Sequence, residues 1–278
     1  MSSPSSDGEF ADRVVIMLGT RRSGTTWLSQ LLSSHPDVAA MELTDVSMAE
    51  GDAHYAKDTV VEAVPSESLV FSAMGDFWVN AHRADGDGIA ALMDAPEVAA
   101  ALREFSDRLF ALARDRAAPG ARWFVEKSPD NVNRIAVASA THPDAAFVHL
   151  IRDGRDVARS LLSWPFAKGG PAAAAEEWAT GIRRVQQHQW RLRRFRVLRY
   201  EKLLADPVGE MRALFEWLGL PVDDDVSKRL EAAAAEQVAR YGDSSPVGAG
   251  KWRGLEPEQL AIIYEVAGDL LAELGYLD

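Results

Sequence analysis

The chain has 278 residues, 47% of them hydrophobic and 26% charged, which is typical of a soluble globular protein with one large α/β domain. Its formal net charge of −12 disfavours nucleic acid or an anionic membrane as a partner, and the absence of cysteine excludes disulfides, thiolate metal sites and a cysteine nucleophile. The sequence has no apolar run of about 18 residues and no signal-peptide pattern at its start, so we expect a cytoplasmic protein without a membrane span.

The first predicted elements surround a loop with two glycines. After a polar stretch at 1–12, which we expect to be a disordered leader, the apolar run VVIML at 14–18 predicts a buried parallel strand. The loop GTRRSGTTW follows at 19–27, and apolar residues at helical spacing then predict a helix that ends at His35-Pro36. Residues 38–41 are predicted to form a second short strand.

The remainder of the chain alternates helical and extended patterns. Residues 42–96 lack a clear period and are expected to form short helices and loops near the substrate. A helical stripe follows at Val98, Leu102, Phe105, Leu109 and Leu112. Strands are predicted at 122–126, 145–151 and 195–200, and helices after Pro129, up to Leu162, and at 171–193, 207–218, 223–240 and 257–274. This alternation predicts a parallel sheet with helices on both faces, and we expect residues 13–278 to form a single domain.

The loop at 19–27 resembles the pattern that binds nucleoside triphosphates, with one departure. Gly19, Gly24 and Thr26 fit the spacing G-x-x-x-x-G-K-[ST], but Thr25 stands at the lysine position. That lysine reaches the β- and γ-phosphates, so its loss argues against hydrolysis of ATP or GTP. Backbone N–H groups at a helix start, two hydroxyls and Arg22 still predict a cradle for an anion.

RRSGTTW at 21–27 resembles the 5′-phosphosulfate loop of the sulfotransferases that use 3′-phosphoadenosine 5′-phosphosulfate (PAPS). PAPS carries one 5′-phosphate bonded to sulfate, and it has no triphosphate or magnesium for a lysine to organise. The resemblance implies the P-loop NTPase-like sulfotransferase fold. It also implies contacts with the 5′-phosphosulfate from Arg22, Ser23, Gly24, Thr25 and Thr26, and stacking of Trp27 on the adenine.

Three later stretches support the same resemblance. FVHLIRDGRDVARSLL at 147–162 is similar to the family's 3′-phosphate motif, in which Arg152 at a strand end and Ser160 in the next helix bind the phosphate. We expect Arg155 and Asp156, by contrast, to be solvated charges at a helix start. The stretch RYEKLL implies that Tyr200 lies near the adenine, and GKWRGL resembles the C-terminal lid, with cofactor contacts from Lys251, Trp252 and Arg253.

In-line transfer of a sulfuryl group needs positive donors and a base. Arg22 and Lys127 are the predicted donors. Where cytosolic members have Lys-Thr-His, this chain has Lys127-Ser128-Pro129, which looks more like the tyrosylprotein, carbohydrate and bacterial branches. Those branches place a glutamate shortly after the second strand, so the resemblance implies a carboxylate base, Glu42, with alternatives at Asp45, His54 and His82. His149 is expected to be a core residue, and no metal site is predicted.

The leading hypothesis is therefore a PAPS-dependent sulfotransferase that acts on a hydroxyl of a small molecule, glycan or lipid. A P-loop kinase or NTPase is the alternative that Thr25 disfavours. A non-catalytic nucleotide-binding protein is the second alternative. The base rate of symmetric oligomers favours a homodimer.

Overall fold

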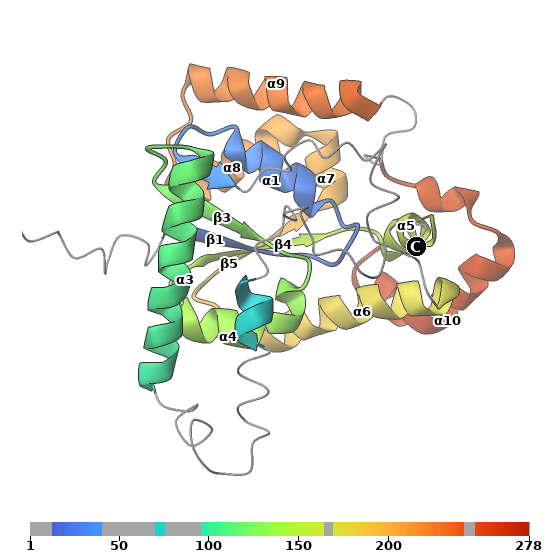
Figure 1. Ribbon diagram of the computed structural model, residues 1–278. Helices are drawn as coiled ribbons and strands as arrows, with labels where there is room; N and C mark the ends of the chain where they lie inside the picture. Colours follow the sequence, from blue (N-terminus) through green and yellow to red (C-terminus); the bar gives the residue numbers. More distant parts are fainter. Residues whose placement is uncertain (1–12, 41–69, 76–95, 164–168, 242–247, 278) are drawn as a thin grey trace, which may run out of the picture.

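The structure, a computed structural model, has five parallel strands that form one sheet in the order β2-β3-β1-β4-β5 (Figure 1). The described residues are 13–40, 70–75, 96–163, 169–241 and 248–277; the predicted leader and most of 42–96 lie outside them. The strands are β1 (Val14–Leu18), β2 (Val38–Ala40), β3 (Trp123–Lys127), β4 (Ala146–Ile151) and β5 (Arg194–Arg199). The predicted parallel sheet is confirmed.

The central strand β1 is buried on both sides, which explains its continuous apolar sequence. Val14, Ile16 and Leu18 belong to the hydrophobic cluster on one face of the sheet. Val15 and Met17 belong to the cluster on the other face. Alternate side chains of a strand point to opposite faces, so a strand with two covered faces needs apolar residues throughout.

Helices cover both faces of the sheet, as the alternating pattern predicts. One face carries α1 (Thr25–Ser33), α7 (Tyr200–Ala205), α8 (Pro207–Leu218) and α9 (Asp224–Tyr241), which lie above the sheet in Figure 1. The opposite face carries α4 (Asn131–Thr141) and α6 (Gly170–His188), with α3 (Pro96–Ala117) at the β2 edge. A short 3₁₀ helix at Gln189–Arg191 ends the stretch that the sequence predicts as one helix to residue 193.

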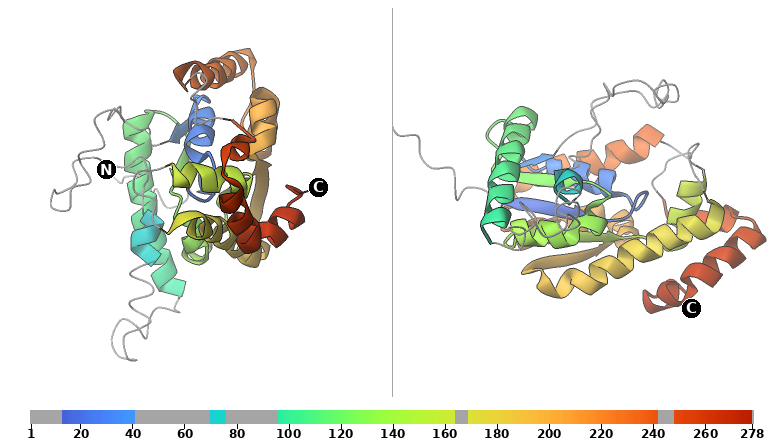
Figure 2. Two further views of the ribbon diagram at one scale, coloured as in Figure 1. Left: turned by 90° about the vertical axis from the view of Figure 1, so that its right-hand side faces the viewer. Right: turned by 60° about the horizontal axis from the view of Figure 1, so that its bottom comes forward.

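A third cluster lies beyond the carboxyl end of β4. It is formed by α5 (Gly154–Leu162), α6 and the last helix, α10 (Pro257–Glu273). Figure 2 shows α10 lying alongside α6, so the C-terminal segment packs against the part of the fold that follows β4. In the described part of the chain, no helix combines the length and apolar character needed to cross a membrane.

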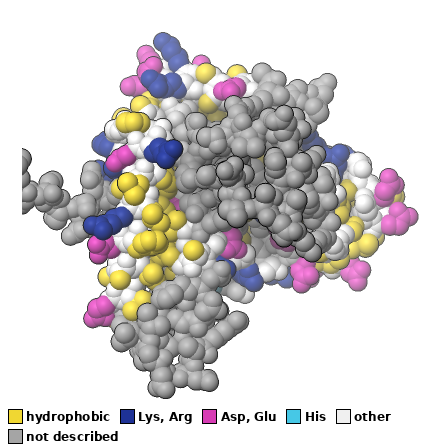
Figure 3. Space-filling view, viewed as in Figure 1, with side chains coloured by type: hydrophobic (Ala, Val, Ile, Leu, Met, Phe, Trp, Pro, Cys, Tyr) yellow, Lys and Arg dark blue, Asp and Glu magenta, His cyan; other side chains and the backbone are white. Residues whose placement is uncertain are grey.

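The amphipathic helix predicted from Val98 to Leu112 is present as α3, but its apolar stripe is not the buried face. Phe105, Leu109 and Leu112 are 55%, 37% and 69% exposed. Figure 3 shows hydrophobic side chains gathered along this helix. The buried positions are Phe110 and Ser106, and the Ser106 hydroxyl donates to the Leu102 carbonyl at 2.8 Å. Because that bond satisfies the hydroxyl, a polar residue occupies the core side of the helix.

His149 lies in the middle of β4 and is a core residue, as predicted. It is 2% exposed. Burial, with a smaller contribution from the positive charge of Arg199, lowers its pKa to about 3. The imidazole is therefore neutral at ordinary pH, and its position within the sheet separates it from the loops that follow the strands.

The strand order places a crevice at the carboxyl ends of β1 and β4. The chain leaves β1 through α1 toward β2 on one side, and it leaves β4 through α5 and α6 toward β5 on the other. Loops that depart in opposite directions leave a gap between them, where open α/β sheets bind ligands. The loop 19–24 and Arg152 follow strands at this edge, and Lys127 is the last residue of β3.

Candidate active site

The loop after β1 requires glycine at two positions. A Cβ atom on Gly19 would lie 2.7 Å from Thr25 Cγ2 and 2.8 Å from the Ser23 hydroxyl oxygen. Gly24 has a φ of 98°, and an added Cβ would lie 2.6 Å from Cε2 of the Tyr200 ring. Only glycine tolerates such close approaches and this left-handed backbone at low cost. The two glycines therefore let the loop fold tightly against α1 and Tyr200.

The loop ends at an open helix N-terminus. No side chain among the described residues caps the start of α1. Thr25 is buried and Thr26 half-buried in its first turn. The Ser23 hydroxyl donates to the Thr20 carbonyl at 2.6 Å, so it stabilises the loop itself. The N–H groups and the dipole of such a helix end attract anions, and the cradle predicted from the sequence has the backbone that it needs.

Arg22 connects the two predicted phosphate motifs. Its Nε donates a hydrogen bond to the Ser160 hydroxyl at 2.9 Å. Its carbonyl accepts a hydrogen bond from Arg152 Nη1 at 3.1 Å. The loop after β1 and the segment after β4 therefore meet in one contact network, although 138 positions separate Arg22 from Ser160 in the sequence.

Arg152 is buried and held by two hydrogen bonds, and one of its three nitrogens has no partner among the described residues. It is 4% exposed, and its Nη2 donates to the Gly248 carbonyl at 2.7 Å. Its guanidinium lies 4.3 Å from the centre of the Tyr200 ring. The buried Nε has no hydrogen-bond partner among the described residues. A buried donor without a partner is costly, and anionic oxygens are the strongest acceptors for a guanidinium. This orphan donor fits a bound phosphate.

Tyr200 and Trp27 form the aromatic side of the site. Their rings meet edge to face, with centroids 5.8 Å apart. The Tyr200 hydroxyl accepts a hydrogen bond from the Gly248 amide at 3.0 Å, and burial raises its pKa. Trp27 is 4% exposed and belongs to the core cluster on the α1 face. Contact of either ring with an adenine stays a prediction.

Lys127 lies at the carboxyl end of β3, beside the start of the loop. Its Cα pairs with that of Met17, two residues before Gly19. The side chain is buried, with 5% of the residue exposed. The preceding residue, Glu126, is fully buried and accepts a hydrogen bond from Asn131. Lys127 is therefore next to the anion cradle, and its role in transfer stays a prediction.

Lys251 and Arg159 bring two further positive charges near Arg152. The lid lysine, Lys251, lies in a short 3₁₀ helix at Lys251–Gly254. Burial lowers the pKa of its ammonium group, and the neighbouring charges of Arg152 and Arg159 lower it further. Arg159, to which the family resemblance assigns no role, directly precedes Ser160. The positive charges of Arg152, Arg159 and Lys251 therefore lie close to one another. Arg253 follows on the same short helix with a more exposed side chain.

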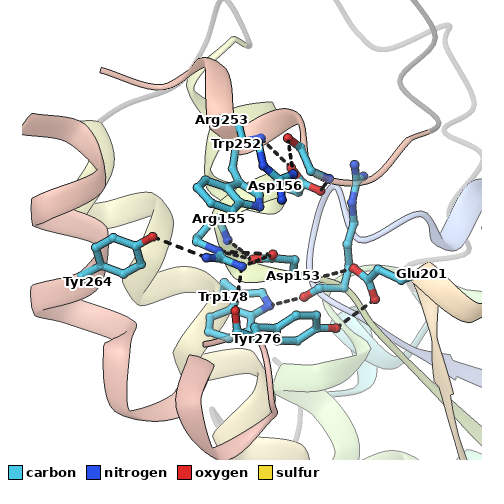
Figure 4. A network of polar contacts seen from close by, with 11 residues as sticks. Asp153, Arg155, Asp156, Trp178, Glu201, Trp252, Arg253, Tyr264 and Tyr276 are labelled. Carbon is cyan, nitrogen blue, oxygen red and sulfur yellow. Dashed lines mark hydrogen bonds and ion pairs between the residues drawn. The ribbon is translucent and has the colours of Figure 1, made fainter. Parts of the chain in front are cut away.

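Arg155 and Asp156 are not solvated charges, and that expectation is wrong. They are 7% and 2% exposed. Arg155 pairs with Asp153 through Nη2 at 2.7 Å, and its guanidinium packs 3.9 Å from the Trp252 ring centre (Figure 4). Asp156 accepts hydrogen bonds from backbone amides of the lid. Both charges are buried because the lid segment folds over the start of α5.

The loop after β1 borders a cavity. This cavity of about 330 Å³ is lined by Thr20, Arg21, Pro129, Asp130, Val132, Asn133 and Glu177. Among the described residues, no cluster of His, Cys, Asp or Glu could hold a metal ion. The four candidate bases, Glu42, Asp45, His54 and His82, lie outside the described residues.

Comparisons with known proteins point to one family. The pattern of the sulfotransferase family matches residues 14–224. Nodulation protein NoeE of Sinorhizobium fredii is 25% identical over 95% of this chain and 66% of its own length. Omega-hydroxy-beta-dihydromenaquinone-9 sulfotransferase Stf3 of Mycobacterium bovis is 29% identical over 54% of this chain and 40% of its own. The chain thus spans less than two thirds of either curated relative.

A solved structure supports the fold. The crystal structure of sulfotransferase STF9 from Mycobacterium avium superposes with a TM-score of 0.58 at 17% identity. The match covers 95% of this chain and 77% of that one. The P-loop-like sulfotransferase fold that the resemblance implies is therefore confirmed.

Proposed function

The chain belongs to the sulfotransferase family, and from this premise we propose that it transfers a sulfuryl group from PAPS to a hydroxyl group of an acceptor. The observation that carries the proposal is the buried, unpartnered Nε of Arg152, next to the contact between Arg22 and Ser160. The cradle of the loop and the cations around Arg152 provide two anion positions. PAPS has two separate anionic groups, a 5′-phosphosulfate and a 3′-phosphate, which match these two positions.

The arrangement disfavours a triphosphate. Thr25 occupies the lysine position of the triphosphate loop, and its side chain is buried against Gly19. A second anion position beside Arg152 has no counterpart in the phosphate chain of ATP, which is continuous. The kinase or NTPase alternative therefore has less support than the sulfotransferase proposal.

When bound, PAPS supplies an activated sulfuryl group on its 5′-phosphate. Arg22 and Lys127 provide positive charge where negative charge develops on the leaving and equatorial oxygens. The hydroxyls and N–H groups of Thr25 and Thr26 orient the same region. We assign the base to Glu42, whose carboxylate accepts the proton of the acceptor hydroxyl.

The acceptor enters by the cavity beside the loop. Its lining mixes polar groups, such as Asp130 and Asn133, with the ion pair that Arg21 Nε makes with Glu177 at 2.7 Å. Hydroxyl groups both donate to and accept from side chains of these kinds. The name of one relative specifies an omega-hydroxylated dihydromenaquinone, which is a hydroxyl acceptor. A homodimer remains the expectation for the oligomeric state.

The proposal is tested by incubating the protein with radiolabelled PAPS and three acceptor classes: a phenol, a lipid alcohol and a glycan. Label is expected on at least one class, with release of adenosine 3′,5′-bisphosphate. Intact PAPS in every mixture, together with phosphoryl transfer from ATP, would contradict the proposal.

Glu42→Gln is expected to lower turnover in this assay, and full turnover would remove Glu42 as the base.

A further inference from the structure

The lid segment at 248–252 is held by side chains from the interior of the fold. Asp156 accepts a hydrogen bond from the Gly250 amide at 2.8 Å through Oδ2. It accepts a second from the Trp252 amide at 2.7 Å through Oδ1. Both carboxylate oxygens of this nearly fully buried residue therefore bind the lid backbone (Figure 4). Such charge-assisted hydrogen bonds are stronger than neutral ones.

Asp156 is not needed to cap its own helix. Asp153 performs that task, because its Oδ1 accepts from the Arg155 amide at 2.9 Å at the start of α5. Two carboxylates three residues apart thus have separate partners, one within the helix start and one in the lid. The carboxylate of Asp156 is therefore bound by the lid backbone.

Lys251 lies between the two anchored amides, so its position depends on Asp156. Its side chain folds back over Gly248, where an added Cβ would lie 2.5 Å from Lys251 Cε and 3.3 Å from Nζ. Gly248 is itself fixed to Arg152 through its carbonyl and to Tyr200 through its amide. The path of the lid therefore brings the ammonium group toward Arg152, which agrees with the effect of the Arg152 charge on the pKa of Lys251.

We propose that Asp156 is a positioning residue of the cofactor site, which fixes the backbone at 250–252 and so places the Lys251 ammonium beside Arg152 for the 3′-phosphate. The inference rests on the proposed function. It explains why both carboxylate oxygens of Asp156 accept hydrogen bonds from the lid backbone. Asp156 makes no contact with the phosphate in this account and acts through Lys251.

The test compares two nucleotides that differ only in the 3′-phosphate, adenosine 3′,5′-bisphosphate and adenosine 5′-phosphate. Asp156→Asn is expected to weaken binding of the bisphosphate by about tenfold and that of the monophosphate by less than about twofold. Asp206→Asn is the matched control, because the Asp206 carboxylate accepts from a backbone amide at 2.8 Å at the start of α8, away from the lid. Both nucleotides should bind this control as they bind the wild type.

A mutant cycle and a wild-type measurement complete the test. Lys251→Gln should cause the same selective loss, and adding Asp156→Asn to it should cost little more. Hydrogen exchange in the wild type should show protected amides at Gly250 and Trp252, a result that does not require the variant to fold.

Three results would each overturn the role of Asp156. The first is that Asp156→Asn loses equal affinity for the two nucleotides, and the second is that the losses of affinity multiply in the double variant. The third is that the amides of Gly250 and Trp252 exchange without protection. Failure of the wild type to bind the bisphosphate would instead contradict the proposed function.

Discussion

Arg152→Ala is expected to weaken binding of adenosine 3′,5′-bisphosphate by roughly a hundredfold, or about 3 kcal/mol. The substitution removes the buried Nε donor, and it also removes the two Nη bonds that fix the carbonyls of Arg22 and Gly248. The lid and the loop therefore lose a shared anchor at the point where the 3′-phosphate is proposed to bind. Isothermal titration of the purified variant measures the loss.

The loss should be specific for the 3′-phosphate. Adenosine 5′-phosphate, which lacks this group, should lose much less affinity in the same variant. Arg193→Ala is a suitable control. Arg193 is exposed and pairs with Asp144 at 2.7 Å. It lies just before β5, at the amino end of a strand, whereas the proposed site lies at the carboxyl ends. Bisphosphate affinity within about twofold of the wild type in Arg152→Ala would remove Arg152 from the proposed site.

Lys127→Met is expected to lower kcat by about a hundredfold or more, with a much smaller effect on the affinity for the bisphosphate. The substitution keeps a long side chain at the buried end of β3 but removes its positive charge. A charge that acts on oxygens developing negative charge contributes to the transition state more than to binding. The measurement is turnover with a good acceptor, together with titration of the bisphosphate.

An exposed lysine controls for the loss of charge alone. Lys228→Met, on α9, should leave both kcat and binding unchanged, since Lys228 is exposed and belongs to the outer helix. If Lys127→Met lost affinity and kcat in equal proportion, Lys127 would be a binding residue. Full activity in Lys127→Met would exclude the proposed electrostatic role.

The sheet was predictable because buried parallel strands have a simple sequence pattern. The run at 14–18 is apolar throughout, the run at 145–151 is apolar except for His149, and each is followed by a loop that carries polar residues. Both faces of such strands are covered, so their sequences need no tertiary information to be recognised. The places of the loop 19–27 and of Arg152 could be predicted from these strands, since each directly follows one of them, whereas their roles were implied by the resemblance to the sulfotransferases.

The lid network could not be predicted because its partners are remote. Asp156 binds amides that lie 94 and 96 positions later, in a segment with no strong secondary-structure pattern. An acidic residue in the first turn of a helix is ordinarily solvated, so local sequence favours the wrong interpretation. For α3, the apolar periodicity predicts the helix but not which of its faces is buried. Ser106 is buried although it is polar, so the pattern of apolar residues does not mark the core side of this helix.

The central claim is that the site binds two separate anions of a 3′-phosphoadenylate and not a triphosphate. Thermal unfolding of the wild type with adenosine 3′,5′-bisphosphate, and in parallel with Mg-ATP, tests it most directly. Saturating bisphosphate is expected to stabilise the fold, by about 2.7 kcal/mol at a hundred times its dissociation constant, while Mg-ATP has little effect. Stabilisation by Mg-ATP without stabilisation by the bisphosphate would contradict the claim.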